Sequence, residues 1–269
     1  MATIGALDVG GTNIKSGRVT GRTVELCPTI AARSREPAEI VLGQLAAAVR
    51  GLGSVDRIAI AMPGPFDHAA GVSRMHDVSK FEAIYGIPLA PELRRRAGLG
   101  DEPIVFVHDA EAAGVGEAVA GAGAGFRRVL TITLGTGVGS CLTDGGVPVR
   151  RVGDLSVDEL AMRPTPHGRA DDVLSVRGLA TLAGADRSKL VDVLAGARGD
   201  DILAEYGRRI EDFLAPTVVE LDAEVVVFGG GAAASYDRFA VQLSFPHRRA
   251  TLGAEGPLLG AALLTEPSA

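Results

Sequence analysis

The chain has little of what a disulfide framework, a thiolate zinc site or a membrane span requires. It contains 269 residues, no tryptophan and only two cysteines, Cys27 and Cys141, which have no motif spacing. These counts exclude a disulfide framework and a cysteine-based zinc site, and we expect both cysteines to be small buried groups. No apolar run reaches the roughly 18 residues of a membrane span, and no charged-then-apolar leader begins the chain. We therefore expect a cytoplasmic protein that does not contact a membrane.

Positive charge is also sparse. The formal net charge is −6, and the arginine pairs are scattered along the chain. Because no basic stripe is present, we expect no nucleic-acid partner. Glycine, by contrast, is abundant, with 36 residues and no collagen period, which indicates tight turns around ligands or close packing. The length suits two medium domains or one large domain.

The most informative segment follows a short apolar run that ends at Asp8. It continues with two glycines, a hydroxyl, an amide and a cation: Gly10, Gly11, Thr12, Asn13 and Lys15. Such a turn lets backbone N–H groups and a hydroxyl approach a phosphate, and Asp8 can hold Mg²⁺ through water because Mg²⁺ retains several waters. No helix signal follows, so this is not a P-loop. The alternative is an ordinary Gly-Gly hairpin.

Strand and helix signals alternate along the chain, as is typical of α/β proteins. We expect strands at 3–8, 14–20, 23–27, 57–62, 103–107, 129–134, 139–143 and 224–228. We expect helices opened by Pro37 and at 91–96, 110–120, 171–184, 188–196, 200–221 and 256–264, with 151–170 polar and irregular. The strand–glycine turn–strand unit near Asp8 recurs near Gly135, which indicates a weak internal duplication of one domain plan.

Three further segments carry candidate chemistry. Gly135, Thr136 and Gly137 follow a strand and would expose several N–H donors to a phosphate, unless they form only a glycine-rich bulge. Asp109 follows His108 where a strand ends and a helix begins, so it can be a helix N-cap, the one carboxylate that phosphoryl transfer needs near the attacking hydroxyl, or both. The run Gly229, Gly230 and Gly231 permits close approach of adenine or of a helix.

Together these segments resemble the ROK family (repressor, open reading frame, kinase) of the actin–Hsp70–sugar kinase superfamily. The family's motifs are matched in order by Asp8 to Lys15, Pro63-Gly64-Pro65, His108 to Glu111 with Gly116-Glu117, Leu134 to Gly139, and Gly229 to Gly231. Order and approximate spacing agree from residue 4 to about residue 264. Each motif is modest, but five in order are specific.

The resemblance implies an α/β fold of the two-domain, actin-like (ribonuclease H-like) ATPase type with an interdomain cleft. The domains would be 1–113 and 114–269, with a final helix at about 256–265 packing back on the first domain. It further implies a cytoplasmic homodimer.

The implied function is ATP-dependent phosphorylation of a hydroxyl of a hexose or sugar-like acceptor. Asp109 would be the general base, and Asp8 would assist Mg²⁺. The implied ATP-binding residues are Asp8, Gly10, Gly11, Thr12, Asn13, Lys15, Gly135, Thr136, Gly137, Gly229, Gly230 and Gly231. The implied acceptor-site residues are Gly64, Pro65, His108, Asp109, Glu159 and Asp172. The last of these corresponds to a sugar-contacting glutamate of the family, for which Asp171 is the alternative.

The chain departs from the family pattern at the acceptor site. The asparagine before the base is His108 here, and the family's zinc-binding histidine is replaced by Met162. The family's cysteine cluster is missing, so the resemblance implies no zinc site. Zinc-free members are similar in 80–86 and 171–177. These departures leave glucose, another hexose, an amino sugar and a cyclitol as candidate acceptors.

Three alternatives to an ATP-dependent kinase remain. A sugar-sensing regulator would need a DNA-binding region, and only seven residues precede Asp8. A polymerising or chaperone-type ATPase would need insertions that this length does not accommodate. A polyphosphate-dependent glucokinase would need a continuous basic groove, which the scattered arginine pairs neither indicate nor exclude.

Overall fold

The computed structural model describes residues 1–78 and 80–266. The chain forms two compact units: unit 1 comprises Met1–Gly116 and the segment from Gly253 onward, and unit 2 comprises Glu117–Leu252. The chain therefore crosses from one unit to the other after Gly116 and returns after Leu252. The domain boundary expected near residue 113 stays a prediction.

Unit 1 is built on a sheet in the order β3-β2-β1-β5-β8. Its strands are β1 (Thr3–Val9), β2 (Asn13–Thr20), β3 (Thr23–Leu26), β5 (Arg57–Met62) and β8 (Ile104–His108), and β4 (Ile30–Ala31) pairs with β2. β1, β2 and β3 are antiparallel neighbours, whereas β5 and β8 run parallel to β1. Parallel strands end at the same edge, so the carboxyl ends of β1, β5 and β8 lie together.

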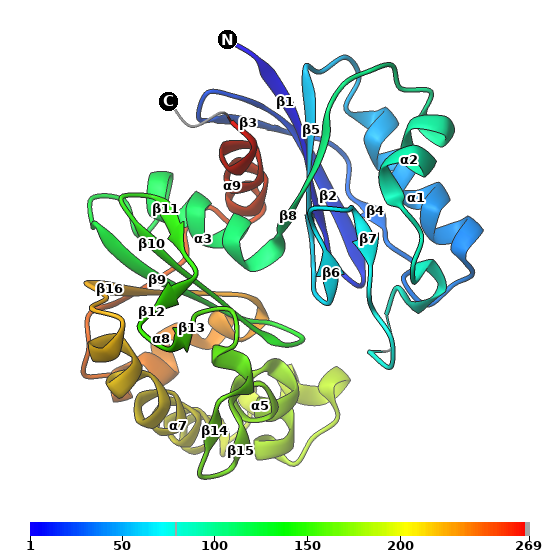
Figure 1. Cartoon of the computed structure of the whole chain (residues 1–269). Coiled ribbons are helices and arrows are strands. Elements are labelled where there is room, and N and C mark those ends of the chain that lie inside the picture. The colour runs from blue at the N-terminus through cyan, green and yellow to red at the C-terminus, as the bar shows by residue number, and fades with distance from the viewer. Residues whose placement is uncertain (79, 267–269) are drawn as a thin grey trace. The chain divides into compact units, whose positions relative to one another are not determined.

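Helices cover both faces of this sheet, which is why β1 and β5 are apolar along most of their length. Figure 1 shows α1 (Ala38–Gly51) and α2 (Leu89–Ala97) on one side and α9 (Glu255–Thr265) on the other. α9 packs on β1, β2 and β5. It also touches α3 (Asp109–Ala120) so closely that a Cβ on Gly260 would lie 1.8 Å from the Ala112 carbonyl oxygen. A short hairpin, β6 (Phe66–Asp67) and β7 (Val72–Ser73), and a 3₁₀ turn, η1 (Glu82–Ile84), complete the unit.

Unit 2 repeats the sheet plan of unit 1. Its order is β11-β10-β9-β16-β17, formed by β9 (Arg128–Leu134), β10 (Val138–Asp144), β11 (Val147–Val149), β16 (Val225–Gly229) and β17 (His247–Arg249). Again three strands are antiparallel neighbours and the last two run parallel to the strand before the glycine turn. The expected internal duplication is thus confirmed at the level of topology.

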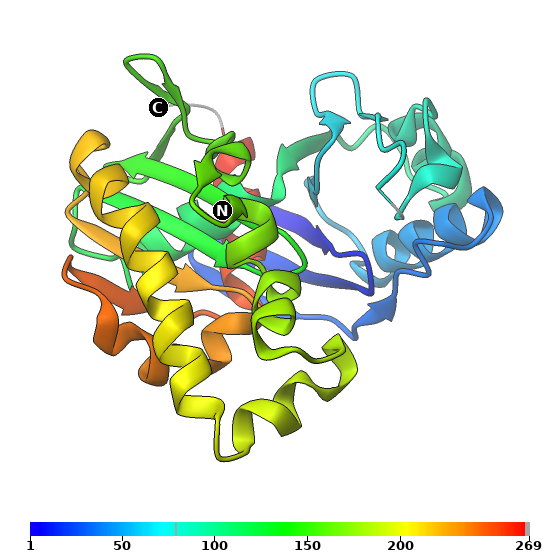
Figure 2. The same cartoon turned by 90° about the horizontal axis from the view of Figure 1, so that it is seen from below.

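A long helix, α7 (Gly199–Glu220), lies against one face of this second sheet (Figure 2). Its Tyr206 is fully buried and donates a hydrogen bond to the Leu174 carbonyl. Shorter helices complete the layer: α4 (Ala170–Leu174), α5 (Val176–Ala183), α6 (Leu190–Ala195) and α8 (Tyr236–Phe239), with 3₁₀ turns η3 (Arg187–Lys189), η4 (Gly231–Ser235) and η5 (Ala240–Gln242).

Several expected elements are wrong in detail. The single helix at 171–184 is two helices, because Ser175 has an extended backbone and its side chain accepts from the Gly178 N–H to start α5. The second helix of unit 1 begins at Leu89 rather than Pro91, since proline fits anywhere in a first turn. Cys141 is buried as expected, but Cys27 is only half-buried.

The segment 151–170, expected to be irregular, carries short elements. They are β12 (Arg151–Val152), β13 (Leu155–Ser156), η2 (Leu160–Met162), β14 (Pro164–Thr165) and β15 (Gly168–Arg169). The strands pair as two small hairpins. Pieces of two residues are too short to leave a periodic signal in the sequence.

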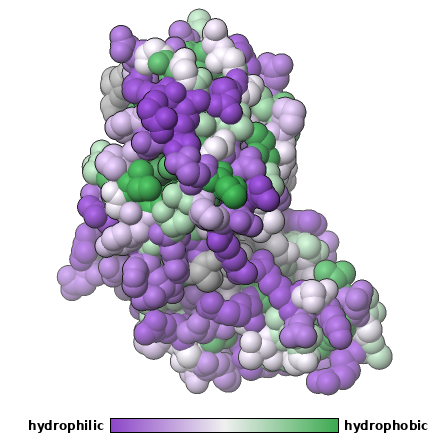
Figure 3. Space-filling model, turned by 90° about the vertical axis from the view of Figure 1, so that its right-hand side faces the viewer, coloured by the Kyte–Doolittle hydropathy of each residue, from purple (hydrophilic) through white to green (hydrophobic). Residues whose placement is uncertain are grey.

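The surface in Figure 3 is mostly hydrophilic, with apolar residues in small separate patches. The large apolar side chains that are exposed come from distant parts of the chain, among them Leu26, Val147, Val191, Val219 and Val241. Over residues 1–78 and 80–266, no helix combines the length and the apolarity needed to cross a membrane.

Candidate functional site

The first glycine turn, residues 10–12, joins β1 to β2 in unit 1. The Gly10 N–H donates to the Asn13 carbonyl at 2.9 Å, which closes the turn. Neighbouring segments brace it, because the Ala32 N–H donates to the Thr12 carbonyl at 2.8 Å and the Ser34 hydroxyl donates to the Gly11 carbonyl at 2.5 Å. The turn is a hairpin in geometry, and these bonds to its carbonyls fix its backbone.

A hollow of about 370 Å³ adjoins this turn and is lined by Ser34, Arg35, Lys80, Glu82 and Ala83. A Cβ on Gly11 would lie 3.5 Å from the Lys80 side chain, so the glycine backbone faces this cation closely. The first glycine turn therefore lies next to the side chain of Lys80, which is not part of the motif from Asp8 to Lys15.

Asp8 lies opposite Lys15 in the β1–β2 register, with the Lys15 Nζ 3.4 Å from an Asp8 carboxylate oxygen. Burial raises the pKa of the Asp8 carboxyl above its usual range. The positive charge of Lys15 opposes this increase, and the negative charge of Asp109 adds to it. The parallel register explains why the two carboxylates interact: Asp8 pairs with Ala61 on β5, and β5 in turn brings Met62 beside His108 at the end of β8.

Asp109 is the first residue of α3 and directly follows β8. One carboxylate oxygen accepts the N–H of the next residue, Ala110, at 2.8 Å, within the first turn of the helix. The side chain is also 39% exposed, which leaves it accessible to a ligand. α3 includes Asp109 as its first residue, and the side chain that accepts an N–H two residues on is that of His108, so the expected N-cap role of Asp109 is wrong.

His108 lies beside a histidine that the sequence analysis did not single out. The rings of His68 and His108 have centroids 5.5 Å apart. The His68 Nε2 lies 3.1 Å from the Met62 carbonyl oxygen, and burial lowers the pKa of His68 below its usual range. Gly64, expected at the acceptor site, is close as well, since a Cβ there would lie 3.9 Å from the His108 Nε2. The peptide bond between Gly64 and Pro65 is cis.

The second glycine turn, residues 135–137, joins β9 to β10 in unit 2. The Gly135 N–H donates to the Gly137 carbonyl at 3.0 Å. Asp171 accepts the Val138 N–H at 2.7 Å, and a guanidinium N–H of Arg187 donates to the Thr136 hydroxyl at 3.1 Å. Neither Asp171 nor Arg187 was assigned to this turn from the sequence, because both are far from it along the chain.

A second hollow, of about 270 Å³, adjoins this turn. It is lined by Thr136, Arg177, Ala180, Thr181, Ala185, Asp186 and Arg187. Arg177 is paired with Asp171 and with Asp172, each at 2.9 Å. Each of the two glycine turns thus adjoins a hollow with two cationic side chains in its lining.

The Gly229–Gly231 segment lies against the end of β9. Gly230 has φ +84°, and a Cβ there would lie 2.6 Å from the backbone of Leu134. The glycine is therefore required by contact with the protein's own backbone, next to the second glycine turn. Of the remaining expected residues, Glu159 is exposed at the start of η2, and Asp172 is exposed on α4, which packs on η2.

No group of three histidine, cysteine, aspartate or glutamate side chains within residues 1–78 and 80–266 is arranged to hold a metal ion. A divalent cation at Asp8 would therefore need ligands from water or substrate.

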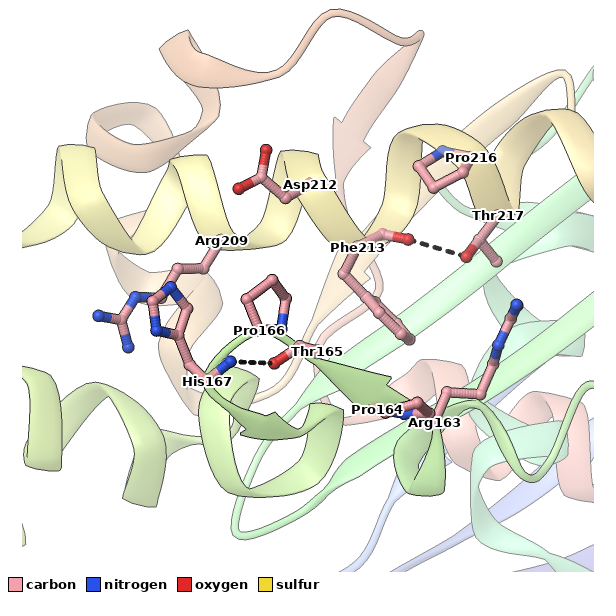
Figure 4. A pocket seen from close by; sticks show the side chains of 10 residues that line it. All are labelled: Arg163, Pro164, Thr165, Pro166, His167, Arg209, Asp212, Phe213, Pro216 and Thr217. Carbon is pink, nitrogen blue, oxygen red and sulfur yellow. Dashed lines mark hydrogen bonds between the residues drawn. The ribbon is translucent and has the colours of Figure 1, made fainter.

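One compact pocket lies away from every expected site residue. It has a volume of about 140 Å³ and is lined by residues of the β14–β15 hairpin and of α7 (Figure 4). Figure 4 shows Thr165 and His167 on the hairpin facing Arg209 and Phe213 on the helix. Because none of the expected residues contributes to it, this pocket is not part of the candidate site.

The fold and the two glycine turns define an actin-like α/β protein of the sugar kinase type. The model of the ROK family matches residues 4–151, which is more than half of the chain. The chain therefore belongs to the ROK family.

Individual relatives include kinases and a regulator. Glucokinase from Streptomyces coelicolor is 34% identical over 147 residues, covering 53% of this chain and 44% of that protein. The DNA-binding transcriptional repressor Mlc from Escherichia coli is 26% identical over 206 residues, covering 67% of this chain and 50% of that protein. The chain thus spans half or less of the length of these relatives. The crystal structure of ROK hexokinase from Thermus thermophilus is 26% identical, with a TM-score of 0.73 and 97% of each chain covered.

Proposed function

We propose that the protein is an ATP-dependent carbohydrate kinase that transfers the γ-phosphoryl group to a hydroxyl of a hexose or sugar-like acceptor. The observation that carries this proposal is the carboxyl edge of the unit 1 sheet. Parallel pairing through β5 places Asp8 and Asp109 at this edge, and the negative charge of Asp109 contributes to the raised pKa of the Asp8 carboxyl. The likeness to a glucokinase and to a ROK hexokinase supports it.

In unit 1, we assign Asp109 as the general base and Asp8 as the residue that assists Mg²⁺. Phosphoryl transfer requires a carboxylate within reach of the attacking hydroxyl, and the Asp109 side chain is partly exposed. Asp8 fits a magnesium role because its carboxylate is a hard oxygen donor, and Mg²⁺ binds through few carboxylates, several waters and substrate phosphates. When bound, the ion would neutralise charge on the transferred phosphate. Gly10, Gly11, Thr12, Asn13 and Lys15 would contact phosphate oxygens.

In unit 2, we assign Gly135, Thr136 and Gly137 to a phosphate of the nucleotide. The support is the hollow beside this turn, whose lining includes Arg187 and Arg177. We assign the segment of residues 229–231, which lies against the end of β9, to the adenosine.

The acceptor residues we propose are Gly64, Pro65, His108 and Asp109 in unit 1, and Glu159 and Asp172 in unit 2. The juxtaposition of Gly64 and His108 supports the first group. A homodimer and a cytoplasmic location belong to the same proposal.

The proposal is tested by incubating the protein with Mg·ATP and a panel of hexoses, amino sugars, polyols and cyclitols. ADP release and the ³¹P spectrum of the product are measured together. We expect one acceptor class to stimulate ADP release and to yield a phosphate monoester in equal amount. Nucleotide binding without a phosphorylated product from any acceptor would contradict the kinase.

The same experiment distinguishes two alternative functions from the ATP-dependent kinase. The likeness to the Mlc repressor favours a sugar-sensing role, which predicts acceptor binding without phosphoryl transfer. A polyphosphate donor would give product when polyphosphate replaces ATP. The cationic lining near Thr136 would favour that donor, but Arg177 there is paired with two carboxylates.

A further inference from the structure

The tautomer of His108 is fixed by its own backbone environment. The Ala110 N–H lies 3.2 Å from the His108 Nδ1 and is shared with the Asp109 carboxylate. A backbone N–H can only donate, so in this contact Nδ1 is the acceptor nitrogen. The ring proton is therefore on Nε2, the nitrogen that faces the Gly64 backbone.

A backbone contact also indicates the tautomer of His68, but here the contact involves Nε2 rather than Nδ1. Its Nε2 lies 3.1 Å from the Met62 carbonyl oxygen. A carbonyl can only accept, so Nε2 carries the proton and Nδ1 keeps its lone pair. Burial lowers the pKa of His68, which keeps the ring neutral and this lone pair available.

The two rings are neighbours with defined support. Their centroids are 5.5 Å apart with an interplanar angle of 57°. Phe66 packs against His68 at 5.1 Å and against Phe106 at 5.4 Å, so the His68 ring is held from the β6–β7 hairpin and from β8. The His108 Nε2–H thus faces Gly64, and the ring that carries the His68 Nδ1 lone pair lies next to it.

We propose that His68 and His108 together bind one hydroxyl group of the acceptor. The Nε2–H of His108 donates to the hydroxyl oxygen, and the hydroxyl hydrogen is donated to Nδ1 of His68. The assignment rests on the proposed function, since the hydroxyl belongs to the molecule that Asp109 activates. Two imidazoles would then divide between them the donor and acceptor roles that one amide side chain combines.

The pair also restricts what can occupy this position. A hydroxyl uses both groups, whereas an ammonium has only donors and would meet the His108 N–H with no lone pair to offer. A deoxy carbon leaves both polar groups without this partner, which a site built to hydrogen-bond a hydroxyl rejects strongly. The acceptor should therefore be a sugar or cyclitol with a free hydroxyl, and no amino group, at the carbon facing this pair.

The tautomers are tested on the unmodified protein by long-range ¹H–¹⁵N spectra of labelled imidazoles at pH 7.5. The chain has five histidines, and the two signals are assigned with His68→Gln and His108→Gln. His76 is an internal reference, because its Nδ1 lies 2.8 Å from an Asp77 carboxylate oxygen and must carry a proton. We expect the Nε2–H tautomer for His68 and His108. The Nδ1–H tautomer, or a charged ring, at either position would overturn the proposal.

The shared hydroxyl is tested with the acceptor identified by the panel above and its monodeoxy analogues. We expect His108→Leu and His68→Phe each to raise KM at least about tenfold, with the double variant little worse than the worse single variant, because both act on one hydroxyl. His76→Leu should leave KM unchanged. For one monodeoxy analogue, neither substitution should change KM further, because the hydroxyl that both residues bind is already missing. Additive effects of the two variants, or different sensitive hydroxyls, would overturn the pairing. A failure to find any acceptor would instead contradict the proposed kinase, and the tautomer spectra are independent of that result.

Discussion

Glu117 anchors the chain where it enters and leaves unit 2, and replacing it by glutamine should destabilise that unit. Glu117 is 4% exposed. It accepts the N–H groups of Ala122 and Leu252, each at 2.9 Å, and that of Thr251 at 3.0 and 3.1 Å. Gly121 is required beside it, because a Cβ there would lie 2.1 Å from a carboxylate oxygen.

The magnitude follows from counting these donors. Glutamine has one oxygen, so in either orientation its NH₂ group faces the N–H of Ala122 or of Leu252. One hydrogen bond to a charged group, worth about 1.5–3 kcal/mol, is lost, and a buried donor remains unsatisfied at about 1–3 kcal/mol. Allowing for partial relaxation, we expect Glu117→Gln to lower the free energy of unfolding by roughly 2–4 kcal/mol.

Urea unfolding at pH 7.5, followed by circular dichroism and by tyrosine fluorescence, measures this change. Glu220→Gln is the matched control, since Glu220 lies in the same unit and makes an exposed ion pair with Arg163 at 3.0 Å. Exposed pairs contribute about 0–1 kcal/mol, so the control should be nearly neutral. A Glu117→Gln protein within about 0.5 kcal/mol of the control would refute the reasoning, because this is the usual range for surface substitutions without special contacts.

Two further stability predictions follow from packing and charge. Gly260→Ala should destabilise the protein by at least roughly 2 kcal/mol, because the added Cβ would overlap the Ala112 carbonyl. Gly43→Ala should stabilise it by about 0.5–1 kcal/mol, because the added Cβ meets nothing within 4 Å. Thermal unfolding of both variants measures these changes. Burial lowers the pKa of His68 and of His247, so the unfolded chain binds protons first as the pH falls through 6.5, the ordinary histidine value. The urea midpoint should therefore drop between pH 7.5 and pH 5, and drop less in a His68→Gln, His247→Gln protein; an equal drop would contradict the assignment.

The strands were largely predictable from the sequence because burial on both faces leaves uninterrupted apolar runs. The strand Arg57–Met62 has the bounds that its apolar run predicts, and the repeated strand–turn–strand unit predicted the repeated sheet plan. Helix boundaries near Ser175 were not predicted, because one serine that changes its backbone conformation interrupts an otherwise helical pattern.

The candidate site was predictable only where its residues follow one another in a motif. Asp8 and Asp109 each end a strand, so their proximity follows from parallel pairing through β5. His68 carries no motif and reaches His108 only because the β6–β7 hairpin folds back. Arg187 reaches Thr136 from 51 residues away, and no spacing rule connects them.

The central claim is that Asp109 is the base of a kinase, and one substitution tests it most directly. An asparagine side-chain oxygen can accept the Ala110 N–H as the aspartate does, so Asp109→Asn removes the charge while retaining this contact. With the best acceptor of the panel, we expect kcat to fall by about 10²–10⁴ while the affinity for Mg·ATP and the unfolding midpoint stay unchanged. A variant that keeps kcat within tenfold of the original would show that Asp109 only begins its helix, and the account of the catalytic site would be wrong.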